Sequence, residues 1–137
     1  GVRLQEKWAH GPKSYLGLSV AEFPNMFTIT GPGSPSVLTN MLPSIEQHVE
    51  WIADCISHMK QQGIQCIEAE QDAEDSWVQH VNEAADLSLR STCNSWYVGA
   101  NIEGKARVFM PYIGGFPRYV EKCSAVIENN YEGYTFS

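Results

Sequence analysis

The sequence is short of basic residues and of long apolar runs, and each shortage excludes a class of function. Its 137 residues include 9 Lys and Arg against 16 Asp and Glu, which gives a formal net charge of −7. Nucleic-acid binders neutralise phosphates with a basic surface, so this charge argues against a nucleic-acid partner. No run approaches the roughly 18 consecutive apolar residues of a membrane-spanning helix, so no membrane partner is expected.

Cysteine is also sparse, and its spacing excludes two further kinds of structure. Cys55, Cys66, Cys93 and Cys123 lie far apart and form no C-x-x-C pair. A disulfide scaffold would be denser in cysteine, so we expect free thiols in the reducing cytoplasm. Cys55 and His58 are three residues apart, but a zinc site needs four ligands and no second pair is present, so no metal is expected.

The remaining composition is typical of a globular protein, and the patterns along the chain favour the α/β class. Apolar residues make up 43% of the chain and charged residues 18%, which excludes intrinsic disorder. The first residues form neither a signal peptide nor a methionine start, so we expect a segment of a longer protein. The local patterns predict a helix-rich segment with short strands and long loops.

The clearest pattern predicts a long helix in the first half of the chain. Apolar residues recur at spacings of four and three, as on one face of a helix: Ile45, Val49, Ile52, Ile56 and Met59. An apolar face of this kind packs against a core. Asn40 is suited to cap the start of this helix, and Gly63 is suited to end it.

Weaker patterns predict the other elements. Short strands are expected at 27–30 and 64–67, and helices at about 72–90 and 117–129, with irregular chain at 91–112. The apolar side of the 72–90 helix is Trp77, Val78, Val81, Ala85 and Leu89. Irregular stretches as long as the one between these two helices are usually functional or disordered.

Neither glycine-rich nor serine-centred motifs identify an activity. The loop from Gly31 to Ser36 precedes the long helix, but it lacks the third glycine of a G-x-G-x-x-G dinucleotide site. Ser34 has Pro32 and Ser36 where a hydrolase nucleophile has two glycines. Trp96 could close over a nucleotide or simply pack in a core, and composition alone favours packing.

Longer stretches together resemble one known family. They are Phe23–Phe27, Gly31–Met41 leading into Ser44–Trp51, Ser95–Lys105 and Tyr131–Gly133. In this order they resemble the C-terminal part of the class B Baeyer–Villiger monooxygenases. The long loop before the helix is most similar to the phenylacetone and steroid monooxygenase branch, and the resemblance extends from Trp8 to Phe136.

The resemblance implies a piece of a flavoprotein with two Rossmann-like domains, one for FAD and one for NADP. Enzymes of this family bind FAD, reduce it with NADPH and insert one oxygen atom of O2 into a ketone to give an ester or lactone. Their dinucleotide motifs and catalytic arginine lie upstream, so no catalytic residue is expected here, and the remainder of the same enzyme is the expected partner. Residues 1–63 would complete the FAD domain with the pocket loop and the long helix. Residues 64–137 would supply the second helix, the control loop, and the final helix and tail.

The resemblance also implies which residues meet the flavin. Met41, at the start of the long helix, would face the flavin ring of FAD, with Asn40 and Leu42 beside it. Their backbone N–H groups would point toward the pyrimidine oxygen of the ring. The physics agrees, because a helix N-terminus stabilises the negative charge of a reduced flavin.

Further positions are implied for the ketone and for NADP(H). Ser36, Val37 and Leu38 would line the ketone pocket together with Met41. Trp96 resembles the control-loop tryptophan that contacts the nicotinamide cofactor when the loop folds in. Two alternatives stay open at this point: a non-enzymatic α/β interaction module, and a catalytically silent fragment.

Overall fold

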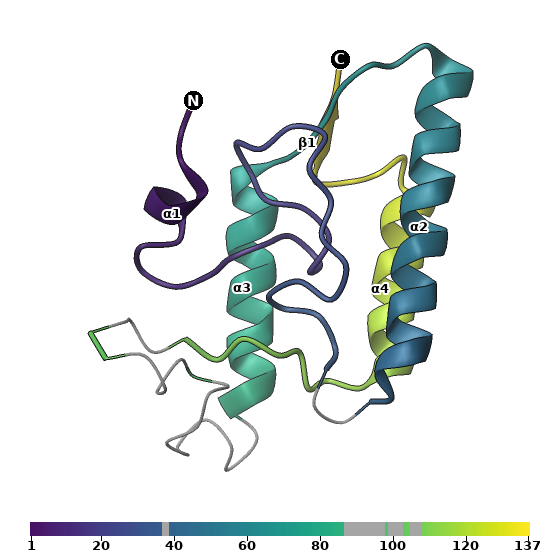
Figure 1. Ribbon diagram of the computed structural model, residues 1–137. Coiled ribbons are helices and arrows are strands. Elements are labelled where there is room, and N and C mark those ends of the chain that lie inside the picture. Colours follow the sequence, from purple (N-terminus) through teal and green to yellow (C-terminus); the bar gives the residue numbers. More distant parts are fainter. Residues whose placement is uncertain (37–38, 87–97, 99–102, 105–107) are drawn as a thin grey trace.

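The computed structural model describes residues 1–36, 39–86, 98, 103–104 and 108–137, and its regular elements are mostly helical (Figure 1). The elements are α1 (Leu4–Lys7), α2 (Met41–Gln62), β1 (Ile67–Ala69), α3 (Gln71–Asp86), α4 (Phe116–Glu128) and β2 (Tyr134–Phe136). β1 and β2 pair antiparallel, with Ile67 opposite Phe136 and Ala69 opposite Tyr134. No described helix is both long and apolar enough to cross a membrane.

The irregular N-terminal chain lies between α3 on one side and the paired helices α2 and α4 on the other (Figure 1). Trp51 of α2 donates its indole N–H to the Cys123 carbonyl of α4 at 3.1 Å. Tyr119 of α4 donates its hydroxyl to the Leu16 carbonyl at 2.6 Å. Trp77 of α3 donates to the Gly33 carbonyl at 3.1 Å. The irregular chain is thus held to α3 and α4 by long-range hydrogen bonds from side chains and not by strand pairing.

One buried carboxylate anchors this irregular chain to α3. Glu74 is fully buried, and its Oε1 accepts the Ala21 backbone N–H at 3.1 Å. Its Oε2 lies 3.1 Å from Nζ of Lys7 and accepts a hydrogen bond from Gln71 at 3.1 Å. A charge removed from water needs such partners, and Glu74 has three of them.

The core is unusually aromatic and contains two thiols. Trp51 packs against Tyr131 edge-on and against Tyr134, with ring centroids 5.5 and 5.6 Å apart. Cys55 of α2 and Cys123 of α4 are fully buried in the same cluster. Because this core takes side chains from α2, α3, α4 and both strands, the parts before and after residue 63 share it.

The bounds of α2 are those that the sequence predicts. Asn40 caps the helix, its Oδ1 accepting the Leu42 N–H at 3.1 Å. Gly63 ends the helix in the left-handed region at φ 70°. The missing side chain of glycine makes this conformation inexpensive.

The inward face of α2 differs from the prediction by one residue. The buried residues are Ser44, His48, Trp51, Cys55 and Met59. Each of the first four comes directly before one of the predicted residues Ile45, Val49, Ile52 and Ile56. One residue corresponds to about 100° around a helix, so part of the predicted apolar face turns away from the core, while Met59 is buried and Ile52 packs against the core. Val49 is 48% exposed and Ile56 39%.

The predicted strand at 27–30 is wrong. The strand predicted at 64–67 is present, but it begins three residues later than predicted. Phe27 forms only an isolated bridge with Ser19, and Thr30 adopts φ 54°, which a strand does not allow. The later strand is β1, which starts at Ile67. The helices predicted near 72 and 117 are confirmed as α3 and α4; residues 87–90 of the former prediction lie outside the described residues.

Candidate functional site

The loop before α2 is fixed in place by hydrogen bonds with residues 110–112 and with Trp77 of α3. Gly33 donates its N–H to the Met110 carbonyl at 2.6 Å, and Tyr112 donates its N–H to the Ser34 carbonyl at 2.9 Å. Gly33 has φ 82°, and a Cβ at this position would lie 2.8 Å from the indole nitrogen of Trp77. Glycine is therefore required where the loop crosses α3, and the loop forms a rigid wall.

A concavity of about 300 Å³ lies between this wall and the N-terminus of α2. It is lined mainly by apolar atoms, from Thr30, Gly31, Pro32, Ser34, Ser36, Met41, Met110 and Pro111. Ser36 and Met41, which the sequence assigns to one substrate pocket, thus share one hollow. Val37, Leu38 and Trp96 lie outside the described residues. A hollow of this composition suits an apolar molecule with a polar group near the helix end.

The first turn of α2 presents a partly positive helix end to this hollow. Met41 is 38% exposed and Leu42 66%. The Leu42 N–H is bound by the Asn40 side chain, and Pro43 has no N–H. In the described part of the chain, this leaves the Met41 N–H as the donor of that turn without an acceptor. An electron-rich ring atom or an anion could take that position.

A buried histidine positions the edge of the hollow. Nδ1 of His48 accepts the Thr30 backbone N–H at 2.9 Å. Nε2 lies 2.6 Å from the Tyr119 hydroxyl, which itself donates to Leu16. Nε2 must therefore carry the proton of a neutral imidazole. Burial lowers the pKa of His48 to about 4, which keeps the ring neutral.

The sequence patterns give no sign of the link that His48 makes between Thr30 and Tyr119. Thr30 lines the hollow and has an unfavourable φ of 54° for a β-branched residue. His48 holds it there across 18 positions of sequence, and Tyr119 is 71 positions away. No spacing pattern marks such distant partners.

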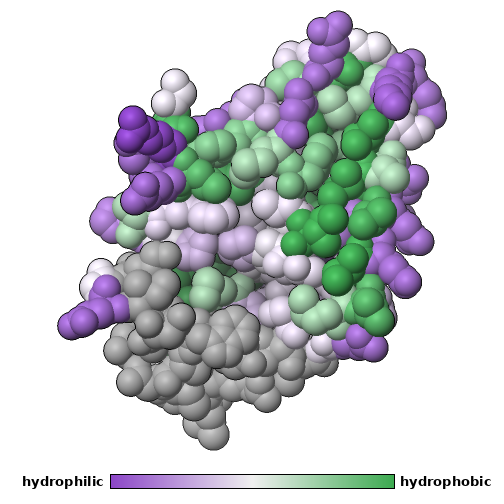
Figure 2. Space-filling view, in the orientation of Figure 1, coloured by the Kyte–Doolittle hydropathy of each residue, from purple (hydrophilic) through white to green (hydrophobic). Residues whose placement is uncertain are grey.

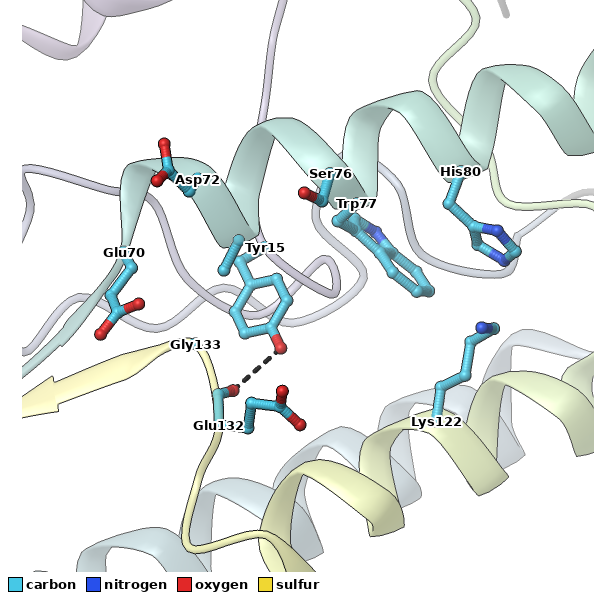
Figure 3. A pocket seen from close by; sticks show the side chains of 10 residues that line it. Tyr15, Glu70, Asp72, Ser76, Trp77, His80, Lys122, Glu132 and Gly133 are labelled. Atoms are coloured by element: carbon cyan, nitrogen blue, oxygen red, sulfur yellow. Dashed lines mark hydrogen bonds between the residues drawn. The ribbon is translucent and has the colours of Figure 1, made fainter.

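A second hollow, of about 480 Å³, lies between α3 and α4 beside β2 (Figure 3). Glu70, Asp72 and Glu132 lie toward one end of it and His80 and Lys122 toward the other, with Tyr15 and Trp77 between them. The pKa of His80 is lowered by burial and by the charge of Lys122. Of the residues that the sequence assigns to a site, those that the structure describes do not line this hollow. No described group of acidic, histidine and cysteine side chains could hold a metal ion.

The curated proteins that match this chain include several monooxygenases. No family model matches the chain. A Baeyer–Villiger monooxygenase of Pseudooceanicola batsensis is 45% identical over 98% of this chain and 24% of its own length. The chain spans about a quarter of the length of the curated relatives it matches.

Solved structures agree over essentially the full chain. A cyclohexanone monooxygenase from Rhodococcus sp. Phi1 bound to NADP+ superposes with a TM-score of 0.96 at 36% identity, covering 100% of this chain and 25% of its own. An oxidized steroid monooxygenase bound to NADP gives 0.91 at 46% identity, covering 99% and 25%. A further structure, a complex of OTEMO with FAD and NADP, gives 0.87 at 35% identity, covering 99% and 25%.

Proposed function

The chain is a segment of the Baeyer–Villiger monooxygenase family, and from this premise we propose that it works as the C-terminal part of an FAD- and NADPH-dependent ketone monooxygenase. The complete enzyme would insert one oxygen atom of O2 into a ketone to give an ester or lactone. The observation that carries the proposal is the superposition of the entire chain on NADP-bound enzymes with TM-scores of 0.91 and 0.96.

In this function the N-terminus of α2 faces the flavin. A bound FAD supplies the redox chemistry, and this chain supplies the environment of the ring. The Met41 N–H, which has no acceptor among the described residues, and the positive end of α2 would stabilise negative charge on the ring by about 0.3–1 kcal/mol. Asn40 and Leu42 would contact the same cofactor, with the Asn40–Leu42 hydrogen bond keeping the first turn in position.

The concavity beside α2 would receive part of the ketone. Its apolar lining excludes water from the reacting group, and its rigid wall limits which substrates fit. Ser36 and Met41 line it, and Val37 and Leu38 would complete it. Trp96 would contact NADP(H), the second cofactor, and close the site against solvent.

The rest of the same enzyme is the partner that this function requires. The chain spans about a quarter of its relatives, and we place the catalytic residue and the dinucleotide motifs in the missing part. Cys55, Cys66 and Cys123 are free thiols, which is compatible with a reducing cytoplasm.

The proposal is tested by placing the chain in a complete enzyme. We expect the purified 137-residue chain to be colourless, with no bound flavin and no NADPH oxidation. A chimera that carries this chain in place of the matching quarter of the steroid monooxygenase should retain FAD and oxidise NADPH in the presence of a ketone. The unaltered steroid monooxygenase, which has its own C-terminal segment, is the control. A folded chimera that retains no flavin, or stoichiometric flavin in the isolated chain, would contradict the proposal.

A further inference from the structure

The hollow between α3 and α4 has charges of both signs on its rim. On the face that Figure 2 shows, hydrophobic side chains gather along the edge where Figure 1 places α2. The hollow of about 480 Å³ is different, because the exposed side chains around it include Glu70, Asp72, Lys122 and Glu132. We define its acidic end as Glu70, Asp72 and Glu132, and its basic end as His80 and Lys122 (Figure 3).

The floor of the hollow is aromatic and fixed in place. Tyr15 and Trp77 are 8% and 6% exposed, and both lie between the two ends (Figure 3). The Tyr15 hydroxyl donates to the Glu132 carbonyl at 2.9 Å, and the Trp77 N–H donates to the Gly33 carbonyl at 3.1 Å. Because these donors are already bonded, the two side chains offer an incoming molecule mainly the apolar faces of their rings.

The acidic end contains carboxylates without a cation beside them. None of the ion pairs among the described residues includes Glu70, Asp72 or Glu132. Burial raises the pKa of Tyr15 to about 12, and the charges of Glu132 and Glu70 add to this effect, so both carboxylates lie near the aromatic floor. Carboxylates around one space attract a cation, and an ammonium group has three N–H donors to share among them.

The basic end lacks acceptors in the same way. Lys122 takes part in no ion pair among the described residues. The pKa of His80 is lowered by burial and by the charge of Lys122, so at about pH 7 its ring is neutral and Lys122 is the cation of this end. Nε2 of His80 is shielded from solvent and has no hydrogen-bond partner among the described residues. Polar atoms of this kind usually have a partner, and a carboxylate held by Lys122 could accept a proton from Nε2 in a hydrogen bond.

Simpler ligands use less of the hollow. No described group of acidic, histidine and cysteine side chains could hold a metal ion. An apolar molecule would leave the charges at both ends without partners, and a simple cation would leave those of the basic end. Small-molecule sites have volumes of about 300–1,000 Å³, with apolar walls and a few polar groups that orient the ligand. The volume and lining of this hollow fit that description.

We propose that this hollow binds a small zwitterion whose ammonium and carboxylate groups lie at opposite ends of a flat apolar body. The ammonium group lies at the acidic end, the body lies on the Tyr15 and Trp77 rings, and the carboxylate lies at the basic end. An amino acid with its two charged groups on opposite sides of an aromatic ring is of this class. The inference does not rest on the proposed function, because none of the described residues assigned to FAD or to the ketone lines this hollow.

Three ligands with the same aromatic body test the site. The compound 4-(aminomethyl)benzoate has both charges, 4-methylbenzylamine has only the ammonium group, and 4-methylbenzoate has only the carboxylate. Each is titrated into the steroid monooxygenase chimera by calorimetry at about pH 7 and low salt, without NADPH. Exposed ion pairs are weak, so we expect the loss of either charge to raise Kd by about fivefold. Added salt should reduce this difference.

Variants of the protein assign the binding to this hollow. Lys122→Gln should remove the preference for the zwitterion over 4-methylbenzylamine. Lys60→Gln removes the same charge from an exposed position of α2 outside the hollow, and it should keep the preference. Asp72→Asn combined with Glu132→Gln should remove the preference for the zwitterion over 4-methylbenzoate. The melting temperature of each variant checks that it is folded.

Three results would overturn the inference. One is a chimera that binds the three ligands equally well or does not bind the zwitterion. Another is a preference that Lys122→Gln leaves intact, because the zwitterion would then bind elsewhere. The third is binding by the isolated chain and not by the chimera, because the rest of the enzyme would then cover the hollow. A chimera that binds the zwitterion as expected but does not oxidise NADPH with a ketone would contradict the proposed function and leave this site supported.

Discussion

His48 shows how one side chain can set both stability and the shape of a site. Its two nitrogens join the Thr30 backbone to Tyr119, and Tyr119 continues the link to Leu16. A protonated ring would have no acceptor for the Thr30 N–H. The site edge therefore depends on the neutral imidazole.

This dependence predicts a loss of stability in weak acid. Burial lowers the pKa of His48 from 6.5 to about 4, so between these values the unfolded chain binds the proton and the folded chain does not. Stability should fall as the pH drops from 6.5 toward 4, by about 3 kcal/mol in total. Urea unfolding at several pH values measures this slope.

The matched variants are His48→Phe and His10→Phe, since His10 is exposed. His48→Phe should be less stable at pH 7.5 and should lose most of the dependence of stability on pH. A smaller dependence should remain because burial also lowers the pKa of His80. His10→Phe should keep the slope. An equal slope in all three proteins would assign the effect to another group.

Trp96 is the residue whose proposed role is separate from the flavin. In the chimera, we expect Trp96→Ala to lower kcat/KM for NADPH by about tenfold, as for the loss of roughly 1.4 kcal/mol of binding, while the FAD content stays unchanged. Trp96→Phe keeps an aromatic ring and removes the indole N–H, so it separates stacking from hydrogen bonding. Equal losses of FAD and of NADPH use would count against the assignment.

At the scale of elements, α2 depends on its first turn. Asn40→Ala removes the acceptor of the Leu42 N–H and should lower the free energy of unfolding by about 1 kcal/mol. Asn40→Asp retains a capping oxygen and should lose much less. Chemical denaturation of the isolated chain measures both. A loss of similar size in the two variants would mean that the cap contributes little.

Local chemistry in the sequence predicts where elements begin and end, and it predicts less well which way they face. Asn40 and Gly63 set the ends of α2 through their own backbone preferences. The inward face contains Ser44 and His48, whose polar groups find partners in the Pro35 carbonyl and in the Thr30 amide. A count of apolar residues ranks such positions below Val49 and Ile56. The same count gave a strand at 27–30, where distant hydrogen bonds decide the backbone.

At the scale of the whole molecule, the irregular N-terminal chain is stable because α3 holds it through Glu74. Glu74→Gln would weaken the contact with Lys7 inside the protein, and we expect a loss of about 3 kcal/mol. Glu22→Gln removes the charge of the second, half-exposed carboxylate beside Lys7 and should cost less than about 1 kcal/mol. Guanidinium unfolding curves give the comparison. Similar losses would mean that burial adds nothing to the pair.

The buried thiols of Cys55 and Cys123 can report when helices α2 and α4 separate. Burial raises the pKa values of Cys55 and Cys123 to about 11, and only the thiolate reacts with alkylating reagents. Labelling at these two sites must wait until α2 and α4 separate, while Cys66, only half-buried, can react sooner. Timed exposure to iodoacetamide, read by mass spectrometry, would therefore record how often the space between the two helices opens.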